Sequence, residues 1–453
     1  MDTLNAIVFF IIAIGVLVTI HEAGHFLVAK RLGVKVLRFS VGFGRPLWRR
    51  RAGADGTEYQ VAMLPLGGYV KMLDEREAEV PPEEAHRAFN NQTLGVRTAV
   101  VAAGPLANFL LAVVAYWLMF MVGVGGFRPV VEEVEPGGLA DRAGLRGGDE
   151  IIAVDGTATR SWDRVMQALT TAAVDGNDAL VRVDTGGADH TLTIAASAID
   201  VDALARRGFL DQLGVEPMRP AIEPVVGRIE KGSPAAAAGL QAGDRLVAAD
   251  GEDIGGWRAW VDYVRARPGK AISLVVERGG SRHILDLVPA ATRDNGATVG
   301  RIGAAVVAPD LATHPLYVVE RYGPVAALGN AAAKTWEVTR LTLAMIWKML
   351  TLQISADNLS GPISIAQYAG DSAKVGLARY LEFLALVSVS LGILNLLPIP
   401  LLDGGHLMYY LIELFKGKPV SEEAQLAGQR LGLAMLAGLM GLAFFNDFVR
   451  LLG

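Results

Sequence analysis

The chain of 453 residues contains no cysteine. Disulfide bonds and thiolate zinc sites are therefore excluded, and any zinc must be held by histidine and carboxylate, the ligand set typical of catalytic sites. Long runs of one charge sign are also missing, and the formal net charge is only -5. This mild charge balance argues against nucleic acid as a partner. The N-terminus has no basic segment before its first apolar run and no clear small-residue cleavage site, so we expect that run to be retained.

Apolar residues, in contrast, are abundant. They make up 52% of the chain, and the mean hydropathy is positive, which predicts both membrane and soluble parts. Four stretches are long and apolar enough to span a bilayer, namely residues 4–29, 98–122, 381–402 and 431–448. The third of these spans is interrupted by Pro398 and Pro400.

Basic residues follow the first and the third predicted span. They are Lys30, Arg31, Lys35, Arg38, Arg45, Arg49, Arg50 and Arg51 after the first, and Lys416, Lys418 and Arg430 after the third. Because positive charge is enriched in cytoplasmic loops, both loops are predicted to face the cytoplasm. We therefore expect residues 124–380 and both termini on the opposite side of the membrane.

A short motif, His21-Glu22-Ala23-Gly24-His25, stands at the predicted cytoplasmic end of the first span. Two histidines four residues apart lie on one side of a helix, about 6 Å apart along its axis, so both can bind one zinc ion. Zinc lowers the pKa of a bound water toward about 7, and Glu22 is placed to take the proton, which gives a hydroxide that attacks a peptide carbonyl. Ionisable groups at hydrocarbon depth are costly and usually functional, which favours an intramembrane zinc protease over a chance match.

A catalytic zinc normally has a third protein ligand. The best candidate is Asp403, which follows the proline-interrupted span, where prolines free backbone groups and allow the chain to turn a carboxylate inward. His406 is a rival for this position. The alternative role for Asp403 is an N-cap of the helix predicted over residues 404–414.

Two segments between the first and second spans, residues 39–44 and 59–72, have the composition of strands and contain several glycines. Non-helical backbone near a bilayer persists only where protein or a wet cavity satisfies its polar groups, so we expect these hairpins to lie beside the active site. An exposed strand edge there could capture an unwound substrate as an added strand. The alternative is a plain cytoplasmic loop with a short sheet.

An internal repeat lies in the long segment after the second span. The pattern A-G-L-x-x-G-D, followed by D-G, occurs at residues 143–156 and again at residues 238–251. It resembles the PDZ fold, a compact β-rich module with two helices, in which Asp-Gly pairs suit hairpins. PDZ domains bind extended chain ends by strand addition. The alternative is that both grooves are empty and the pair acts as a spacer or steric gate. The helical stretch that follows, residues 312–350, lies along the membrane surface or packs on this pair as a linker.

These motifs together resemble the site-2 protease family over nearly the whole chain. The resemblance rests on H-E-x-x-H in a first span, N-x-x-P-x-P-x-x-D-G in a third, the two PDZ-like repeats, and residues 67–72 in the first loop. Residues 104–108 and 359–363 also fit the family pattern. The resemblance implies an inner-membrane zinc endoprotease that acts in regulated intramembrane proteolysis.

The resemblance also assigns roles to residues. His21, His25 and Asp403 would hold Zn²⁺, and Glu22 would be the general base. Asn395 would hold the substrate backbone, and the residues implied to pair with substrate as a strand are Gly67, Gly68, Tyr69, Val70, Lys71 and Met72.

The implied substrates are single-pass membrane proteins, above all an anti-sigma factor in envelope stress signalling, with remnant signal peptides as a second class. An upstream periplasmic site-1 protease would first trim the anti-sigma factor, and the PDZ pair would exclude untrimmed substrates.

The resulting prediction is an α-helical polytopic membrane protein with four transmembrane helices, a membrane-associated β-hairpin region and two periplasmic PDZ domains of α+β type. The predicted segments are a first transmembrane helix (1–29), the hairpin region (30–97), a second transmembrane helix (98–123), two PDZ domains (124–218 and 219–310), linker helices (311–380), a third transmembrane helix (381–412), a cytoplasmic loop (413–430) and a fourth transmembrane helix (431–453).

Two other functions compete with the protease. One is a membrane-anchored peptide-binding scaffold with an inactive metal site, and the intact Glu22 argues against it because a scaffold needs no acid between the histidines. The other is a transporter that uses intramembrane histidine and aspartate as a proton relay, which leaves the repeats unexplained.

Overall fold

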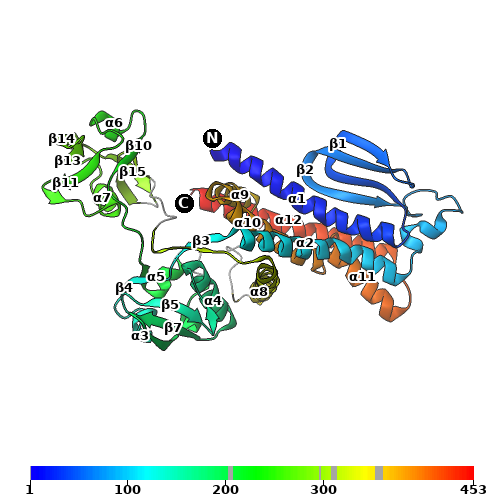
Figure 1. Ribbon diagram of the computed structural model, residues 1–453. Coiled ribbons are helices and arrows are strands. Elements are labelled where there is room, and N and C mark those ends of the chain that lie inside the picture. Colours follow the sequence, from blue (N-terminus) through cyan, green and yellow to red (C-terminus); the bar gives the residue numbers. More distant parts are fainter. Residues whose placement is uncertain are drawn as a thin grey trace.

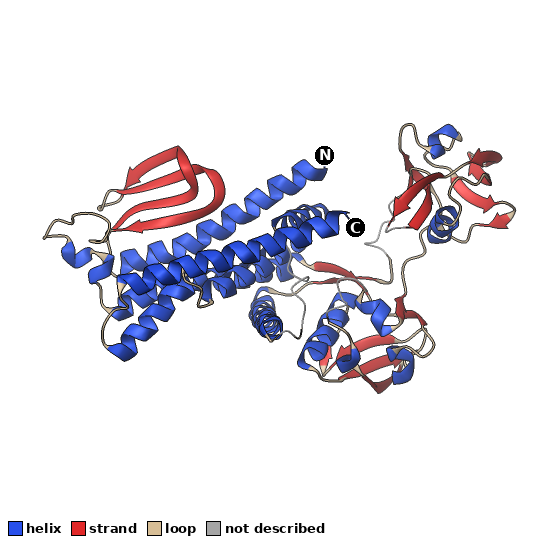
Figure 2. Ribbon diagram, turned by 180° about the vertical axis from the view of Figure 1, so that it is seen from behind, coloured by secondary structure: helices blue, strands red, loops and turns tan. Residues whose placement is uncertain are grey.

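Four long helices lie side by side in a bundle in the computed structural model (Figures 1 and 2). The structure describes residues 2–201, 208–294, 297–307, 314–351, 353 and 361–452. The four helices are α1 (Asp2–Arg31), α2 (Leu94–Val122), α10 (Leu377–Leu396) and α12 (Glu422–Leu452), and each is long and apolar enough to cross a membrane. The chain is thus a polytopic membrane protein with a β-rich part, as predicted.

Small residues allow the first two helices of the bundle to approach closely. A Cβ atom on Gly24 of α1 would overlap the carbonyl oxygen of Ala103 and lie 2.8 Å from the Cβ of Ala107, both on α2. Because lipid tails are as apolar as leucine, helices in membranes associate through such close packing of small side chains. The close contact brings the histidine motif of α1 against one face of α2.

The third predicted span is not one helix. Helix α10 begins at Leu377 and ends at Leu396, and a new helix, α11 (Asp403–Lys416), begins only at Asp403. The segment predicted as one helix over 381–412 is therefore corrected, because Pro398 and Pro400 lack the N–H that a helix needs and disfavour helical backbone before them.

The loop predicted over residues 413–430 is also shorter in the structure. Helix α11 continues to Lys416 and α12 starts at Glu422. The fourth helix is accordingly longer than the predicted 431–453, since its polar first turns lie outside the apolar stretch on which the prediction rested.

The segment between α1 and α2 forms a folded-over β-sheet alongside α1 (Figure 1). Strands β1 (Val36–Ala52) and β2 (Thr57–Met72) are long, and each bends, so that they form a sheet of four segments. The two outer pairs run antiparallel, whereas residues 38–41 and 58–61 in the middle pair run in the same direction. Their order across the sheet is 46–52, 57–62, 36–41 and 68–72. Gly42 and Gly44 take positive φ values of 91° and 86° at the bend of β1, a conformation that favours glycine. Short helical turns, η1 (Ala85–Arg87) and η2 (Phe89–Asn91), then lead to α2.

Two β-rich units with the same strand order follow α2. The first contains β4 (Val131–Val134), α3 (Leu139–Ala143), β5 (Glu150–Val154), β6 (Thr157–Ala158), α4 (Trp162–Asp175), β7 (Ala179–Thr185), β8 (Ala188–Ile194), η3 (Ala196–Ala198), α5 (Phe209–Leu213) and β9 (Val215–Pro217). The second contains β10 (Val226–Ile229), α6 (Pro234–Ala237), β11 (Arg245–Ala249), β12 (Glu252–Asp253), α7 (Trp257–Arg265), β13 (Ile272–Arg278), β14 (Ser281–Leu287), β15 (Ala290–Asp294), β16 (Ala297–Arg301) and β17 (Ala304–Val306).

The sheets β6-β5-β7-β8 and β12-β11-β13-β14 correspond, as do the pairs β4-β9 and β10-β17. Each unit has its own buried apolar core. The turn residues Asp155 and Asp250 both have positive φ and precede the glycines of the two predicted Asp-Gly turns.

Strand β3 (Val124–Phe127) lies at the predicted start of the first unit, residue 124. It pairs with β18 (Tyr317–Glu320), so the chain entering and the chain leaving the two units lie together. Since Phe127 of β3 also packs against the core of the first unit, the boundary at residue 124 stays a prediction.

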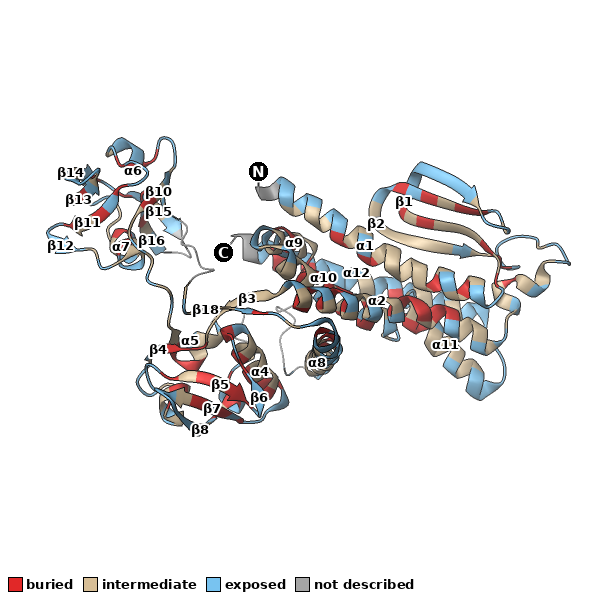
Figure 3. Cartoon of the chain, viewed as in Figure 1, coloured by how far each residue is buried: buried red, intermediate tan, exposed pale blue. Residues whose placement is uncertain are grey.

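Two helices return the chain to the bundle, α8 (Pro324–Leu350) and α9 (Pro362–Val375). Helix α8 buries small residues such as Ala327 and Ala331 and exposes Trp336 and Trp347, so only one of its faces is packed. Figure 3 shows buried residues along α2 and inside both β units, whereas α8 is largely exposed on one side. The motif predicted at residues 359–363 lies partly outside the described residues, because the description resumes at Gly361.

Candidate metal centre

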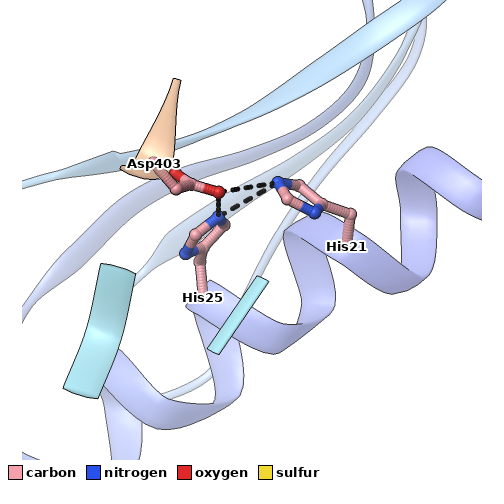
Figure 4. A group of neighbouring side chains, drawn as sticks. All are labelled: His21, His25 and Asp403. Atoms are coloured by element: carbon pink, nitrogen blue, oxygen red, sulfur yellow. Dashed lines mark hydrogen bonds and ion pairs between the residues drawn. The ribbon is translucent and has the colours of Figure 1, made fainter. Parts of the chain in front are cut away.

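Three side chains from two distant parts of the chain converge at one point (Figure 4). His21 Nε2 lies 3.3 Å from Asp403 Oδ2, His25 Nε2 lies 3.4 Å from the same oxygen, and the two nitrogens are 3.3 Å apart. A tetrahedral zinc with bonds of about 2.0–2.2 Å places its ligand atoms about 3.3–3.6 Å from one another. The triangle therefore has the size that one zinc ion requires.

The burial of the triangle fits the same conclusion. His25 is buried, and the side chain of Asp403 is 19% exposed. Asp403 Oδ2 itself is inaccessible and accepts no hydrogen bond from the described residues. A buried carboxylate oxygen without a donor is costly unless a cation meets it, and two imidazoles with one carboxylate form the donor set of a catalytic zinc.

The break between α10 and α11 places Asp403. Leu401 has a φ of 98°, a strained value for a residue other than glycine, and the chain turns there before α11 begins. A Cβ on Gly404 would overlap the carbonyl oxygen of Leu397, and one on Gly405 would lie 2.6 Å from that of Ile399. The two glycines after Asp403 therefore permit the tight return that directs the carboxylate to the histidines.

Asp403 is not the N-cap of α11 in the structure. Leu402 occupies the cap position of α11, and Asp403 is the first helical residue. Its carboxylate points at the two imidazoles (Figure 4). His406, the rival ligand, lies outside the group of three ligand atoms that come within 4.8 Å of one another.

A cavity of about 730 Å³ adjoins the triangle. All the residues to which the sequence analysis assigned a role line it, together with His406. They are His21, Glu22, His25, Gly67, Gly68, Tyr69, Val70, Lys71, Met72, Asn395 and Asp403. The structure thus gathers the predicted site residues from α1, β2, α10 and α11 around one space.

The edge of the sheet meets the catalytic motif directly. Within the described part of the chain, residues 68–72 pair only with residues 36–41 of β1, so this segment is an edge of the four-segment sheet. A Cβ on Gly68 would lie 2.8 Å from Cγ of Glu22 and 2.9 Å from Cγ1 of Val18. The glycine lets the strand edge lie against α1 at Glu22.

Helix α2 supplies contacts that sequence reasoning did not find. The carbonyl oxygen of Val100 is 2.8 Å from His25 Nδ1, and the side-chain nitrogen of Asn108 is 3.1 Å from His21 Nδ1. A Cβ on Gly104 would overlap the ring of His25. One available signal was an asparagine inside an apolar span, since polar groups there usually have a partner.

Comparison with known proteins places the chain in a family. The description "Peptidase family M50" matches residues 9–439. The chain is 48% identical over 448 residues to the regulator of sigma-E protease RseP of Salmonella typhimurium and 47% identical over 447 residues to that of Escherichia coli, covering 98% of each chain in both cases. It is 44% identical over 455 residues to a Neisseria meningitidis protein named as a zinc metalloprotease, covering 99% of this chain and all of the relative.

Proposed function

The chain belongs to peptidase family M50, the site-2 proteases, and on this basis we propose that His21, His25 and Asp403 hold its zinc and that Glu22 is the general base. Members of this family are zinc metalloproteases, and so is this chain. The observation that carries the proposal is the triangle of ligand atoms from α1 and α11, which measures 3.3–3.4 Å on each side. Family membership favours a protease over the scaffold or the transporter.

The roles of the chain's own groups follow from where they lie. Bound zinc supplies the Lewis acidity that activates a water molecule and polarises the scissile carbonyl. Glu22 follows His21 on α1 and faces the same cavity. Its carboxylate takes a proton from the attacking water and returns a proton to the leaving amine nitrogen, so that one peptide bond and one water give one acid and one amine.

Residues 68–72 hold the substrate as an added strand. A transmembrane helix satisfies its amides internally, so a protease must unwind it and offer replacement partners. A strand edge that lines the cavity can offer them, and main-chain pairing tolerates varied side chains. Asn395, in the last turn of α10 and on the same cavity, would bind the substrate backbone from the other side.

The substrates that we propose are single-pass membrane proteins, with an anti-sigma factor and remnant signal peptides as the two classes. The names of the Salmonella and Escherichia relatives, regulators of sigma-E, support the first class. The two β units would be periplasmic PDZ domains that exclude substrates until an upstream site-1 protease has trimmed them. Their equal strand order supports a tandem pair.

The proposed location is the bacterial inner membrane, with the active site towards the cytoplasm. In Figure 1 the start of α1 and the end of α12 point towards the β units, whereas α11 lies at the opposite end of the bundle. This arrangement supports termini on the periplasmic side, together with the β units.

The deciding experiment compares the purified protein with Glu22→Gln on a trimmed, tagged single-pass substrate, with bound zinc measured in both. We expect the wild type to cleave, and the variant to keep zinc and lose cleavage by at least about a hundredfold, the lower end of the range for a missing general base. A variant that still cleaves would remove Glu22 from its role. If both proteins keep zinc and neither cleaves this substrate or any of a panel of signal peptides, the peptide-binding scaffold would be favoured.

A further inference from the structure

One face of α2 contacts the two histidines of α1. Val100, Gly104 and Asn108 are spaced four residues apart and so lie along one side of the helix. They meet His25 and His21, which are also four residues apart, in the reverse order. Val100 and Asn108 are both fully buried. The two helices therefore meet as complementary rows at the metal centre.

The ring nitrogens that face away from the triangle need acceptors. Both histidines present Nε2 to Asp403 and to each other. An imidazole that binds a metal through Nε2 carries its proton on Nδ1, and a partner for that proton fixes the tautomer and the ring orientation. For His25 the partner is the carbonyl oxygen of Val100, 2.8 Å from Nδ1.

For His21 the only partner in reach among the described residues is the Asn108 amide. Its Nδ2 lies 3.1 Å from Nδ1, while its Oδ1 is buried and without a donor in the described part of the chain. Nδ2 is a donor, so this orientation suits only a His21 with its proton on Nε2, which could not bind a metal there. A half-turn of the amide exchanges its two ends. It places Oδ1 against Nδ1–H and gives the unpaired oxygen its donor.

Asn108 is itself held in place from the other side. The hydroxyl of Ser388, on α10, donates to the backbone carbonyl of Asn108 at 2.7 Å, and both residues are fully buried. The backbone of Asn108 is thus fixed between α1 and α10, with its side chain next to His21.

We propose that Asn108 is a positioning residue that accepts the Nδ1 proton of His21 through Oδ1 and so holds Nε2 free for the metal. The inference rests on the proposed zinc site, because it assumes that His21 is a ligand. A merely structural role, a polar contact between α1 and α2, is the competing explanation.

The test measures zinc affinity of the full-length protein by competition with a chelator. Asn108→Leu removes the acceptor at nearly constant volume, and Asn108→Asp keeps an acceptor of the same shape. We expect the leucine variant to bind zinc 10- to 100-fold more weakly, the usual effect of losing such a partner, and the aspartate variant to stay within a few-fold of the wild type. Equal zinc affinity in the leucine variant, or equal weakening in both, would overturn the proposal.

A second measurement needs no variant at Asn108. In ¹⁵N-histidine NMR of the zinc-loaded protein, we expect His21 to carry its proton on Nδ1, with the signal assigned by its loss in His21→Gln. Metal binding through Nδ1 would overturn the proposal even if the leucine variant does not fold. Failure of the zinc site itself would look different, because His21→Gln would then bind zinc as tightly as the wild type.

Discussion

At the scale of single residues, the metal centre depends on the absence of a side chain at Gly104. The ring of His25 occupies the space in which a Cβ on this residue would stand. In Gly104→Ala the ring must move, which breaks its hydrogen bond to Val100 and spoils the triangle with Asp403. We expect zinc affinity to fall by about tenfold or more, as for other losses of a ligand's supporting contact.

Chelator competition on purified protein measures this effect. Gly95→Ala is the matched control, because Gly95 lies in the first turn of the same helix and a Cβ there would meet nothing within 4 Å. Zinc binding of wild-type strength in Gly104→Ala would mean that His25 tolerates displacement and that its contact with α2 is unimportant.

The same scale shows what the sequence could and could not predict. His21 and His25 were predictable because their spacing alone places them on one helix face. Asp403 was predictable as a candidate because prolines and glycines surround it. The contact of His25 with Val100 was not, since a backbone carbonyl leaves no trace in residue type, and the Asn108 contact depends on how two helices cross.

At the scale of elements, the proposed pairing of substrate with residues 68–72 of β2 can be tested by changing the strand backbone. Val70→Pro removes one backbone N–H and disfavours pairing on both sides, while Val70→Thr keeps the N–H and the β-branched shape. We expect the proline variant to lose at least tenfold in substrate cleavage and to retain zinc, since Val70 lies outside the metal triangle. If the proline variant cleaved the substrate as fast as the threonine variant, residues 68–72 would not act by pairing with the substrate as a strand.

Helix α12 is joined to α9 by one buried carboxylate. Asp447 accepts the backbone N–H groups of Gly361 and Ile363, and the hydroxyl of Ser364 donates to it at 2.6 Å. It thus satisfies donors at the start of α9 that no helical carbonyl reaches. Asp447→Ala should lower the free energy of unfolding by about 2 kcal/mol, the upper range for a lost cap, measured by thermal unfolding in detergent.

The control for this variant is Asp371→Ala on α9, where an exposed carboxylate pairs with Lys374 three residues on. Such an exposed ion pair contributes little to stability. Equal stability of the two variants would show that α12 is not held through Asp447. No sequence pattern indicated this contact, because Ile363 and Gly361 lie 84 and 86 residues before Asp447 along the chain.

Element boundaries show the same division between local and distant causes. The four apolar helices were predictable from composition within a local window. The prolines of the third span indicated that it is divided, but they did not indicate how long the two resulting helices are. The sheet beside α1 was predictable as strands only, because its four-segment order depends on two bends and on pairing between segments far apart in sequence.

At the scale of the whole molecule, the two β units are attached in different ways. The first is bound to the bundle side by paired charges, Arg379 with Asp163 and Arg340 with Asp175, and by Arg164 with Glu320 of β18. The second is bonded to the first through Arg258 and Glu216. The repeat was visible in the sequence, whereas this unequal attachment arises from single residues outside the repeated pattern.

The orientation of the whole chain gives the last prediction. Since the chain has no cysteine, single cysteines can report which side of the membrane a residue faces. Ser281→Cys lies at the start of β14 in the second unit, and Ser421→Cys lies between α11 and α12; both positions are exposed.

With the basic loops in the cytoplasm, a membrane-impermeant maleimide should label only residue 281 in cells with a permeabilised outer membrane. Residue 421 should react only after lysis, whereas a permeable maleimide should label both. Labelling of 421 in intact inner membranes would place α11 and the metal site towards the periplasm, and the proposed order of external trimming before internal cleavage would then lose its geometric basis.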